Sequence, residues 1–320
     1  MTTLRVLMYS FKGGAGRTVS TANLAVLLAK QYNRRVTLVD LDVESAGTSV
    51  LFGLERESTD GTCWTIQDVL RGSWEPPPKK TSDEGSRRKE TVQIDNSFEE
   101  TLWKRIHRSI DVGPGPGCLN VLPARTILQS SDEARGFSGV SQLRFGNLIE
   151  AMELLHPPPE LILFDSASGL QQTAHLGLMS CHVLVIFFRW TRQFMFGTTR
   201  FLSEYLCQNL SIAKRIRKVI LVPTAVPRGA PGGVLEEARE RRRKVLENEE
   251  LPLINQSVRM ASAKMPEQWA SVHAPIYESD LLKWDDRILL LDETSPALDG
   301  SENLLEDYRG LATTLSDLAK

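Results

Sequence analysis

The feature that most constrains the fold is a short apolar run that leads through a glycine-rich turn into a helix. The run "LRVLMY" (4–9) has the composition of a buried strand, and the turn "SFKGGAGR" that follows holds three glycines within four residues. Residues 17–31 then show the leucine spacing of an amphipathic helix. A strand, a tight turn and a helix in this order bring backbone N–H groups and a helix N-terminus to one point. Such a point favours the binding of a phosphate group.

The same alternation of strand and helix continues along the chain. Further strand-like runs are almost entirely apolar, which is typical of a sheet that is covered on both faces. The pattern predicts an α/β fold with a mostly parallel, doubly wound sheet flanked by helices. The predicted strands are 4–9, 36–40, 119–122, 161–165, 183–188 and 218–223, and the predicted helices are 17–31, 141–155, 198–210 and 235–247.

We predict a single domain over residues 1–320, interrupted by one surface insertion at 72–117. This stretch is rich in proline, glycine and mixed charge, and its first part has too few apolar residues to fold alone. Within it, residues 98–107 have the pattern of a short amphipathic helix that packs back on the core. A second loop, 223–234, follows a predicted strand, at the sheet edge where ligands bind in folds of this kind.

Composition excludes several classes of function. The formal net charge of −2 predicts no general attraction to nucleic acid or to anionic membranes. The four cysteines are far apart and form no C-x-x-C pair, which favours a reducing compartment and argues against a zinc site. No run approaches the roughly 18–20 apolar residues that span a bilayer, and no leader pattern precedes the first strand. We therefore expect a cytoplasmic protein.

The loop "KGGAGRT" (12–18) departs from the general phosphate-loop pattern G-x-x-x-x-G-K-[ST], because Phe11 replaces the first glycine and Arg17 the lysine. It resembles instead the deviant Walker A motif K-G-G-x-G-K-[ST] of the ParA/MinD family of ATPases. "VTLVDLDVESAG" (36–47) resembles the second motif of that family, and "ELILFDSASGL" (160–170) resembles its Walker B strand. The closing "LLEDYRGLATTLSDLA" resembles its final helix, so the likeness covers most of the chain in the right order.

Arg17 further resembles a variant group of this family with a K-G-G-V-G-R loop. In that group the loop is accompanied by D-x-D-x-E, which Asp40, Asp42 and Glu44 resemble. Members of the group are associated with bacterial defence and signalling modules as well as with unassigned roles, so a defence or signalling role is one that the resemblance implies.

The resemblance also implies a role for each site residue. Thr18 would hold Mg²⁺ directly, Asp165 would hold it through water, and Asp40 would support its shell. Asp42 would orient or activate the attacking water. Lys12 would reach across a dimer to the phosphates bound by the partner, so ATP-dependent dimerisation is implied. The residues expected to bind nucleotide are Gly13, Gly14, Ala15, Gly16, Arg17, Thr18 and Val19, with Thr224 and Arg228 near the base; catalysis is assigned to Asp42, Lys12 and Arg17.

Replacing the loop lysine with Arg17 changes the chemistry without removing the charge. A guanidinium is planar and favours two parallel hydrogen bonds to phosphate oxygens, so binding should persist. The placement of charge in the transition state should be less favourable, because phosphoryl transfer depends on positioning and electrostatics. Lys12, Thr18 and the three aspartates all remain, which favours a working site over a decayed one.

Three functions follow in order of preference. The first is an ATP-binding switch that dimerises around Mg-ATP, hydrolyses ATP slowly and regulates a protein partner. The second is a nucleotide-binding regulatory module without turnover, which Arg17 would explain. The third is a DNA partition or positioning ATPase, which the net charge makes the least favoured. The arginine-rich run 236–251 could bind nucleic-acid phosphates through Arg241, Arg242 and Arg243, but we favour a solvated helix with i,i+4 ion pairs. The acidic final helix differs from a basic membrane-binding tail, so we expect no membrane attachment.

Overall fold

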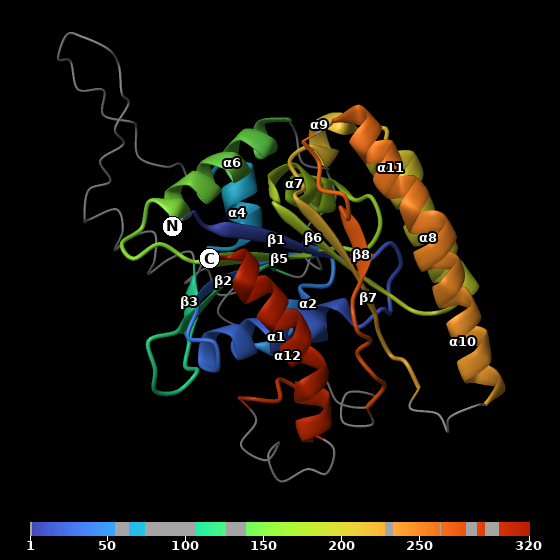
Figure 1. Cartoon of the computed structure of the whole chain (residues 1–320). Coiled ribbons are helices and arrows are strands. Elements are labelled where there is room, and N and C mark those ends of the chain that lie inside the picture. The colour runs from blue at the N-terminus through green and yellow to red at the C-terminus, as the bar shows by residue number, and fades with distance from the viewer. Residues whose placement is uncertain are drawn as a thin grey trace.

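The computed structural model describes residues 2–54, 64–73, 107–125, 139–227, 233–262, 264–279, 287–291 and 301–320. Within these residues eight strands form one sheet in the order β3-β4-β2-β5-β1-β6-β7-β8 (Figure 1). Every neighbouring pair is parallel except β3 and β4, which are antiparallel. The predicted doubly wound, mostly parallel sheet is therefore confirmed. The strands are β1 (Leu4–Tyr9), β2 (Arg35–Leu41), β3 (Arg108–Ile110), β4 (Cys118–Leu122), β5 (Leu161–Ser166), β6 (Val183–Phe188), β7 (Lys218–Pro223) and β8 (Ala270–Val272).

Helices cover both faces of the sheet. Figure 1 shows α1 and α12 on one face, α4, α6 and α7 on the other, and α8, α10 and α11 beside the β7–β8 edge. Two π-helical stretches, η1 and η2, continue α8 and α10 without a break. The helical elements are α1 (Arg17–Lys30), α2 (Gly47–Leu51), α4 (Ile66–Arg71), α6 (Gly139–Glu153), α7 (Gln172–Ser180), α8 (Arg192–Arg200), η1 (Phe201–Leu206), α9 (Leu210–Ala213), α10 (Val234–Val245), η2 (Leu246–Glu250), α11 (Leu251–Ala261) and α12 (Ser301–Leu318).

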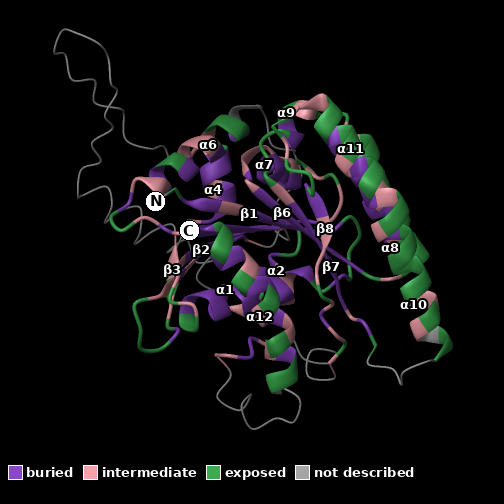
Figure 2. Cartoon of the chain, viewed as in Figure 1, coloured by how far each residue is buried: buried purple, intermediate pink, exposed green. Residues whose placement is uncertain are grey.

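The core lies along the central strands. All residues of β5 and β6 are buried, as are five of the six in β1, because helices pack on both faces (Figure 2). This double burial explains why these strands consist of almost continuous apolar runs. No helix in the described part of the chain is both long and apolar enough to cross a membrane.

One end of the predicted insertion 72–117 contributes to the sheet. Residues 108–110 form β3, and Ser109 pairs with Asn120 of β4 at the sheet edge. The predicted helix 98–107 lies outside the described residues, apart from its last position. The helix predicted over 198–210 begins earlier, at Arg192, after an extended Thr191.

The parallel arrangement brings the carboxyl ends of the central strands to one edge of the sheet. The register places Asp165 of β5 opposite Met8 of β1 on one side and opposite Asp40 of β2 on the other. The turn that follows β1 therefore lies beside the acidic residues at the ends of β2 and β5. In open α/β sheets this edge is where ligands bind.

Candidate functional site

The turn between β1 and α1 presents backbone N–H groups to the outside. Gly14 and Gly16 have φ of 81° and 71°, a left-handed conformation that glycine adopts without strain. Gly16 precedes the first residue of α1, and no side chain caps this end of the helix. The N-terminal N–H groups of α1 are thus open to an anionic ligand. Lys12, Gly13, Gly14 and Gly16 are all exposed.

Three distant segments hold this turn in place. The Thr224 hydroxyl donates a hydrogen bond of 2.6 Å to the carbonyl of Ala15, and the N–H of Gly169 donates one of 3.0 Å to the carbonyl of Ser10. The Phe11 ring packs on α8 at Gly197, where an added Cβ would lie 2.2 Å from the ring. Phe11, at the position of the usual first glycine, therefore anchors the loop to α8. The turn is preorganised.

Asp40 lies beneath the turn at the end of β2 and is completely buried. One of its oxygens accepts hydrogen bonds from the N–H (3.0 Å) and the hydroxyl (2.9 Å) of Ser49, and the other accepts one from the N–H of Asp42 (3.1 Å). Burial and the neighbouring Asp165 carboxylate raise the pKa of Asp40 to about 8. Asp40 thus fixes the start of α2 and the turn after β2.

The guanidinium of Arg17 lies among the other acidic residues. Its Nε donates to Asp165 Oδ1 at 2.6 Å, and its Nη2 donates to Asp42 Oδ2 at 2.9 Å. The same Nη2 donates to the Thr18 hydroxyl at 3.1 Å. Burial alone would lower the pKa of Arg17, but the charges of Asp165 and Asp42 outweigh it and raise the pKa above its ordinary value. The guanidinium therefore stays charged.

The remaining oxygens of these two carboxylates also have partners. Asp165 Oδ2 accepts a hydrogen bond of 2.8 Å from the Thr48 hydroxyl, and Asp42 Oδ1 accepts one of 3.2 Å from the N–H of Ser45. Hydroxyl and carboxylate oxygens have the chemistry that Mg²⁺ prefers, yet here they bind donors of the protein. No group of three or more His, Cys, Asp or Glu side chains among the described residues is placed to hold a metal ion. In this arrangement the residues predicted to hold Mg²⁺ do not fit it.

Lys12 lies apart from the carboxylates, on the exposed side of the turn. Its Nζ donates to Gln193 Oε1 and lies 5.9 Å from the centroid of the Phe194 ring. Both partners belong to α8. Glu44 is also exposed, and its carboxylate accepts a hydrogen bond of 3.0 Å from Gln171.

A cavity of about 230 Å³ adjoins the turn at the ends of β1 and β7. Thr224, predicted near the base, lines this cavity, and its hydroxyl bonds the carbonyl of Ala15 and, at 3.2 Å, the carbonyl of Phe188. The residues that line it include Ala15, Gly16, Val19, Thr224, Tyr277 and Tyr308.

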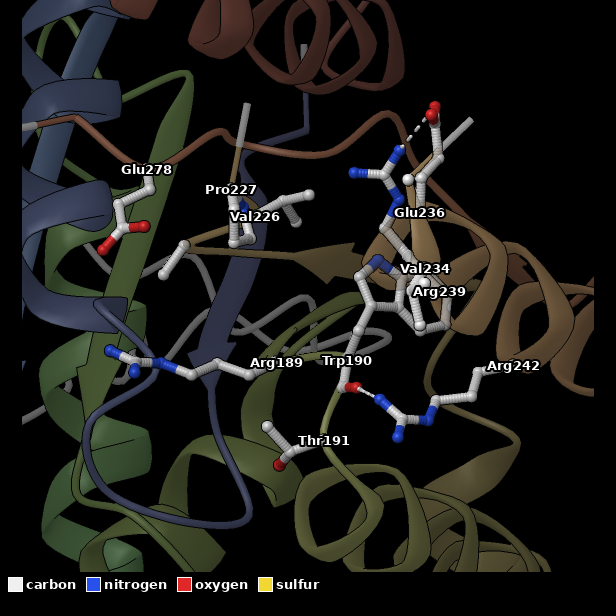
Figure 3. A pocket seen from close by; sticks show the side chains of 12 residues that line it. Arg189, Trp190, Thr191, Val226, Pro227, Val234, Glu236, Arg239, Arg242 and Glu278 are labelled. Carbon is white, nitrogen blue, oxygen red and sulfur yellow. Dashed lines mark hydrogen bonds and ion pairs between the residues drawn. The ribbon is translucent and has the colours of Figure 1, made fainter. Parts of the chain in front are cut away.

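A second cavity, of about 590 Å³, shares part of its lining with the first and is shown in Figure 3. Arg189 and Glu278 line both cavities. Arg189 extends from the end of β6 toward the side on which Glu278 lies (Figure 3). Pro227 lines the larger cavity, whereas Arg228, predicted near the base, lies outside the described residues.

Sequence reasoning did not identify Arg189, Tyr277, Glu278 or Tyr308 as part of the site. Arg189 directly follows a predicted strand at the ligand-binding edge, a signal that could have identified it. The other three come from segments more than 200 residues from the turn in sequence, and no local pattern connects them with it.

Comparison with known proteins identifies the family to which the chain belongs. The sequence profile of the CobQ/CobB/MinD/ParA nucleotide binding domain matches residues 6–268. An uncharacterised ATP-binding protein of Methanocaldococcus jannaschii is 24% identical over 183 residues, which are 57% of this chain and 52% of that protein. This chain thus spans about half the length of that relative.

Solved structures share the fold over almost the whole chain. A plasmid partition protein from Borrelia burgdorferi is similar with a TM-score of 0.58 and 14% identity, covering 99% of this chain and 100% of that one. The septum site-determining protein MinD of Pyrococcus horikoshii, solved with Mg-ADP, has a TM-score of 0.56 and 16% identity, covering 99% of both chains. The match of the family profile to most of the sequence, together with the glycine turn at the end of β1, shows that the chain belongs to the CobQ/CobB/MinD/ParA family of nucleotide-binding domains.

Proposed function

We propose that this chain is an ATP-binding switch protein whose nucleotide site is the turn at residues 12–18. The observation that carries the proposal is the exposed glycine turn at the uncapped N-terminus of α1, held rigidly beside buried carboxylates. The backbone N–H groups of this turn would bind the phosphates, because a helix N-terminus favours negative charge. The nucleotide bound by the Pyrococcus relative supports the same use of the fold here.

The base would enter the cavity of about 230 Å³ beside Val19 and Tyr277. Thr224 would support it indirectly, by fixing the Ala15 carbonyl of the turn. The preference for adenine rests on the family alone.

Lys12 would connect two copies of the chain. It is exposed at the rim of the turn and contacts α8 rather than the carboxylates of its own chain. We propose that it reaches the phosphates bound by a second copy, so that ATP drives a homodimer. A protein partner would recognise this dimer, and slow hydrolysis, with Asp42 orienting water, would return the chain to its resting state.

Light scattering after size-exclusion chromatography, with a non-hydrolysable ATP analogue, tests this proposal. We expect the wild type to change from monomer to dimer, and Lys12→Ala to bind the analogue but remain monomeric. Lys30→Ala is the matched control, because Lys30 is an exposed lysine at the far end of α1 that bonds the Leu290 carbonyl. A Lys12→Ala protein that dimerises like the wild type would rule out the bridging role.

A nucleotide-binding module without turnover is the second candidate. It is favoured by the 2.9 Å contact of Arg17 with Asp42, the carboxylate proposed to orient water. Phosphate-release assays on the wild type and Arg17→Lys separate the two functions. No turnover in the wild type, with a gain in the variant, would select the module over the ATPase.

A further inference from the structure

We infer that the guanidinium of Arg17 stands in the place of a divalent cation, so that this chain binds ATP without a requirement for Mg²⁺. The inference rests on the proposed nucleotide site and adds to it the chemical state of the ligand. Thr18 and Asp165, which were predicted to hold a metal ion, instead bond Arg17.

The side chain of Arg17 contacts the oxygens that were predicted to hold the metal ion and to orient water. Arg17 donates to Asp165 at 2.6 Å, to Asp42 at 2.9 Å and to the Thr18 hydroxyl at 3.1 Å. These residues come from three separate elements, at the end of β2, in β5 and in the first turn of α1. A single cation thus joins the carboxylates to the phosphate-binding helix.

The guanidinium also keeps a donor for the nucleotide. Its Nε and Nη2 make all three contacts, and Nη1 has no hydrogen-bond partner among the described residues. Because the guanidinium is planar and carries five N–H groups, it can bond carboxylates along one side and a phosphate oxygen along another. A divalent ion would form the same bridge between carboxylates and phosphate.

Electrostatics oppose the entry of a metal while Arg17 holds this position. Asp165 is completely buried and Arg17 is 7% exposed, so their charges interact with little screening by water. A divalent cation would have to displace the guanidinium from the carboxylates or bind beside another positive charge. The other oxygens of both carboxylates are held by Thr48 and Ser45.

A lysine at position 17 would behave differently. An ammonium is a compact charge without the guanidinium fork, so it cannot hold Asp42 and Asp165 in the same way. We expect Arg17→Lys to release Asp42 and the Thr18 hydroxyl, which then become available to a metal. The variant should therefore acquire a Mg²⁺ requirement that the wild type lacks.

Calorimetric titration of ATP in Mg²⁺ and in EDTA tests the inference. The wild-type dissociation constants should agree within about threefold, whereas Arg17→Lys should bind at least about tenfold more weakly in EDTA, a difference of about 1.4 kcal/mol. The matched control is Arg34→Lys at the opposite edge of the sheet, where a similar arginine fork bonds Glu160 at 2.8 Å and Ser316 at 2.9 Å. Its Mg²⁺ dependence should equal that of the wild type. A wild type that binds ATP at least about tenfold more tightly with Mg²⁺ overturns the inference.

Titration of the nucleotide-free protein with Mn²⁺, followed by electron paramagnetic resonance, gives an independent readout. We expect no bound Mn²⁺ in the wild type and one bound ion in Arg17→Lys. Bound Mn²⁺ in the wild type that is lost in Asp165→Asn overturns the inference. A complete failure to bind ATP would refute the proposed function, and the Mn²⁺ titration would still decide whether the guanidinium holds the metal position.

Discussion

The side chain of Arg17 at the candidate site shows how a buried charge is stabilised by surrounding groups. It lies between Asp42 and Asp165, and the hydroxyl of Thr48 completes the hydrogen bonding of Asp165. Each group in this cluster depends on the others, because an unpaired charge or donor is costly away from water. Single substitutions in the cluster should therefore lower the free energy of unfolding by more than the small change in side-chain volume suggests.

Thr48→Val tests this dependence. Thr48 is completely buried, and its hydroxyl donates 2.8 Å to Asp165 Oδ2. Valine has nearly the same shape but no donor, so we expect the free energy of unfolding to fall by about 1.5–3 kcal/mol, the usual range for a hydrogen bond to a charged group. Thr48→Ser keeps the donor and loses one methyl group, at about 1 kcal/mol. A Thr48→Val protein as stable as the wild type in urea unfolding would show that this hydrogen bond adds no stability.

His182 governs part of the pH dependence of stability. Burial, followed by the charges of Arg5 and Arg217, lowers the pKa of His182 from 6.5 to about 4. The folded chain therefore binds this proton more weakly than the unfolded chain does. The contribution of uncharged His182 to the free energy of unfolding is therefore complete above pH 6.5. It is lost as the pH falls from 6.5 toward 4. His182→Gln should flatten this acid limb in urea unfolding between those values, and a variant as acid-sensitive as the wild type would assign the limb to other groups.

At the scale of secondary-structure elements, the close approach of two backbones limits which residues can stand at a position. Gly117 precedes β4 and lies against the end of α1, where an added Cβ would be 2.0 Å from the Ala29 carbonyl oxygen. Gly146 in α6 has no atom within 4 Å of the same position. The two glycines therefore make a matched pair.

We expect Gly117→Ala to lower the free energy of unfolding by about 1–3 kcal/mol, because the backbone of α1 must shift. Gly146→Ala should be neutral or stabilising by up to about 1 kcal/mol, since alanine is the better helix former. Thermal unfolding of both variants measures the difference. A Gly117→Ala protein as stable as the wild type would mean that α1 and β4 are not held in this contact.

The long buried strands could be predicted from the sequence, and the short edge strands could not. Residues 183–188 form an uninterrupted apolar run, and β6 has the same bounds. In contrast, β3 and β8 have three residues each and are only partly buried, so their pairing depends on neighbours that lie elsewhere in the chain. The residues around the turn were identifiable from their motif, but the direction of the Arg17 guanidinium was not. That direction depends on Asp42 and Asp165, and local sequence spacing does not predict where these two residues lie relative to Arg17.

At the scale of the whole molecule, positive and negative residues nearly balance, with 38 Lys and Arg against 40 Asp and Glu, and three arginines of α10 have partners. On α10, Arg239 contacts Glu236 at 3.4 Å, and Arg243 contacts Glu247 of η2 at 3.0 Å. Arg242 bonds the carbonyl of Trp190. With a net charge of −2, the molecule has no excess of positive charge to attract DNA.

We therefore expect no DNA binding stronger than the non-specific range of about 10⁻⁴–10⁻⁶ M at physiological salt, with or without ATP. Fluorescence anisotropy with a random duplex measures it. Binding that is tighter than this range, appears only with ATP and weakens steeply with salt would favour a partition or positioning function over a protein-directed switch.

The most direct test of the central claim is calorimetric titration of ATP into the wild type and two glycine variants. Gly14 and Gly53 have φ of 81° and 67°, and neither has an atom within 4 Å of an added Cβ. Both alanine variants therefore carry a similar backbone strain, but only Gly14 belongs to the turn that we propose binds phosphate. We predict one ATP per chain for the wild type and Gly53→Ala, and binding at least about tenfold weaker for Gly14→Ala. No heat of binding with ATP or ADP in the wild type, with or without Mg²⁺, would contradict the account.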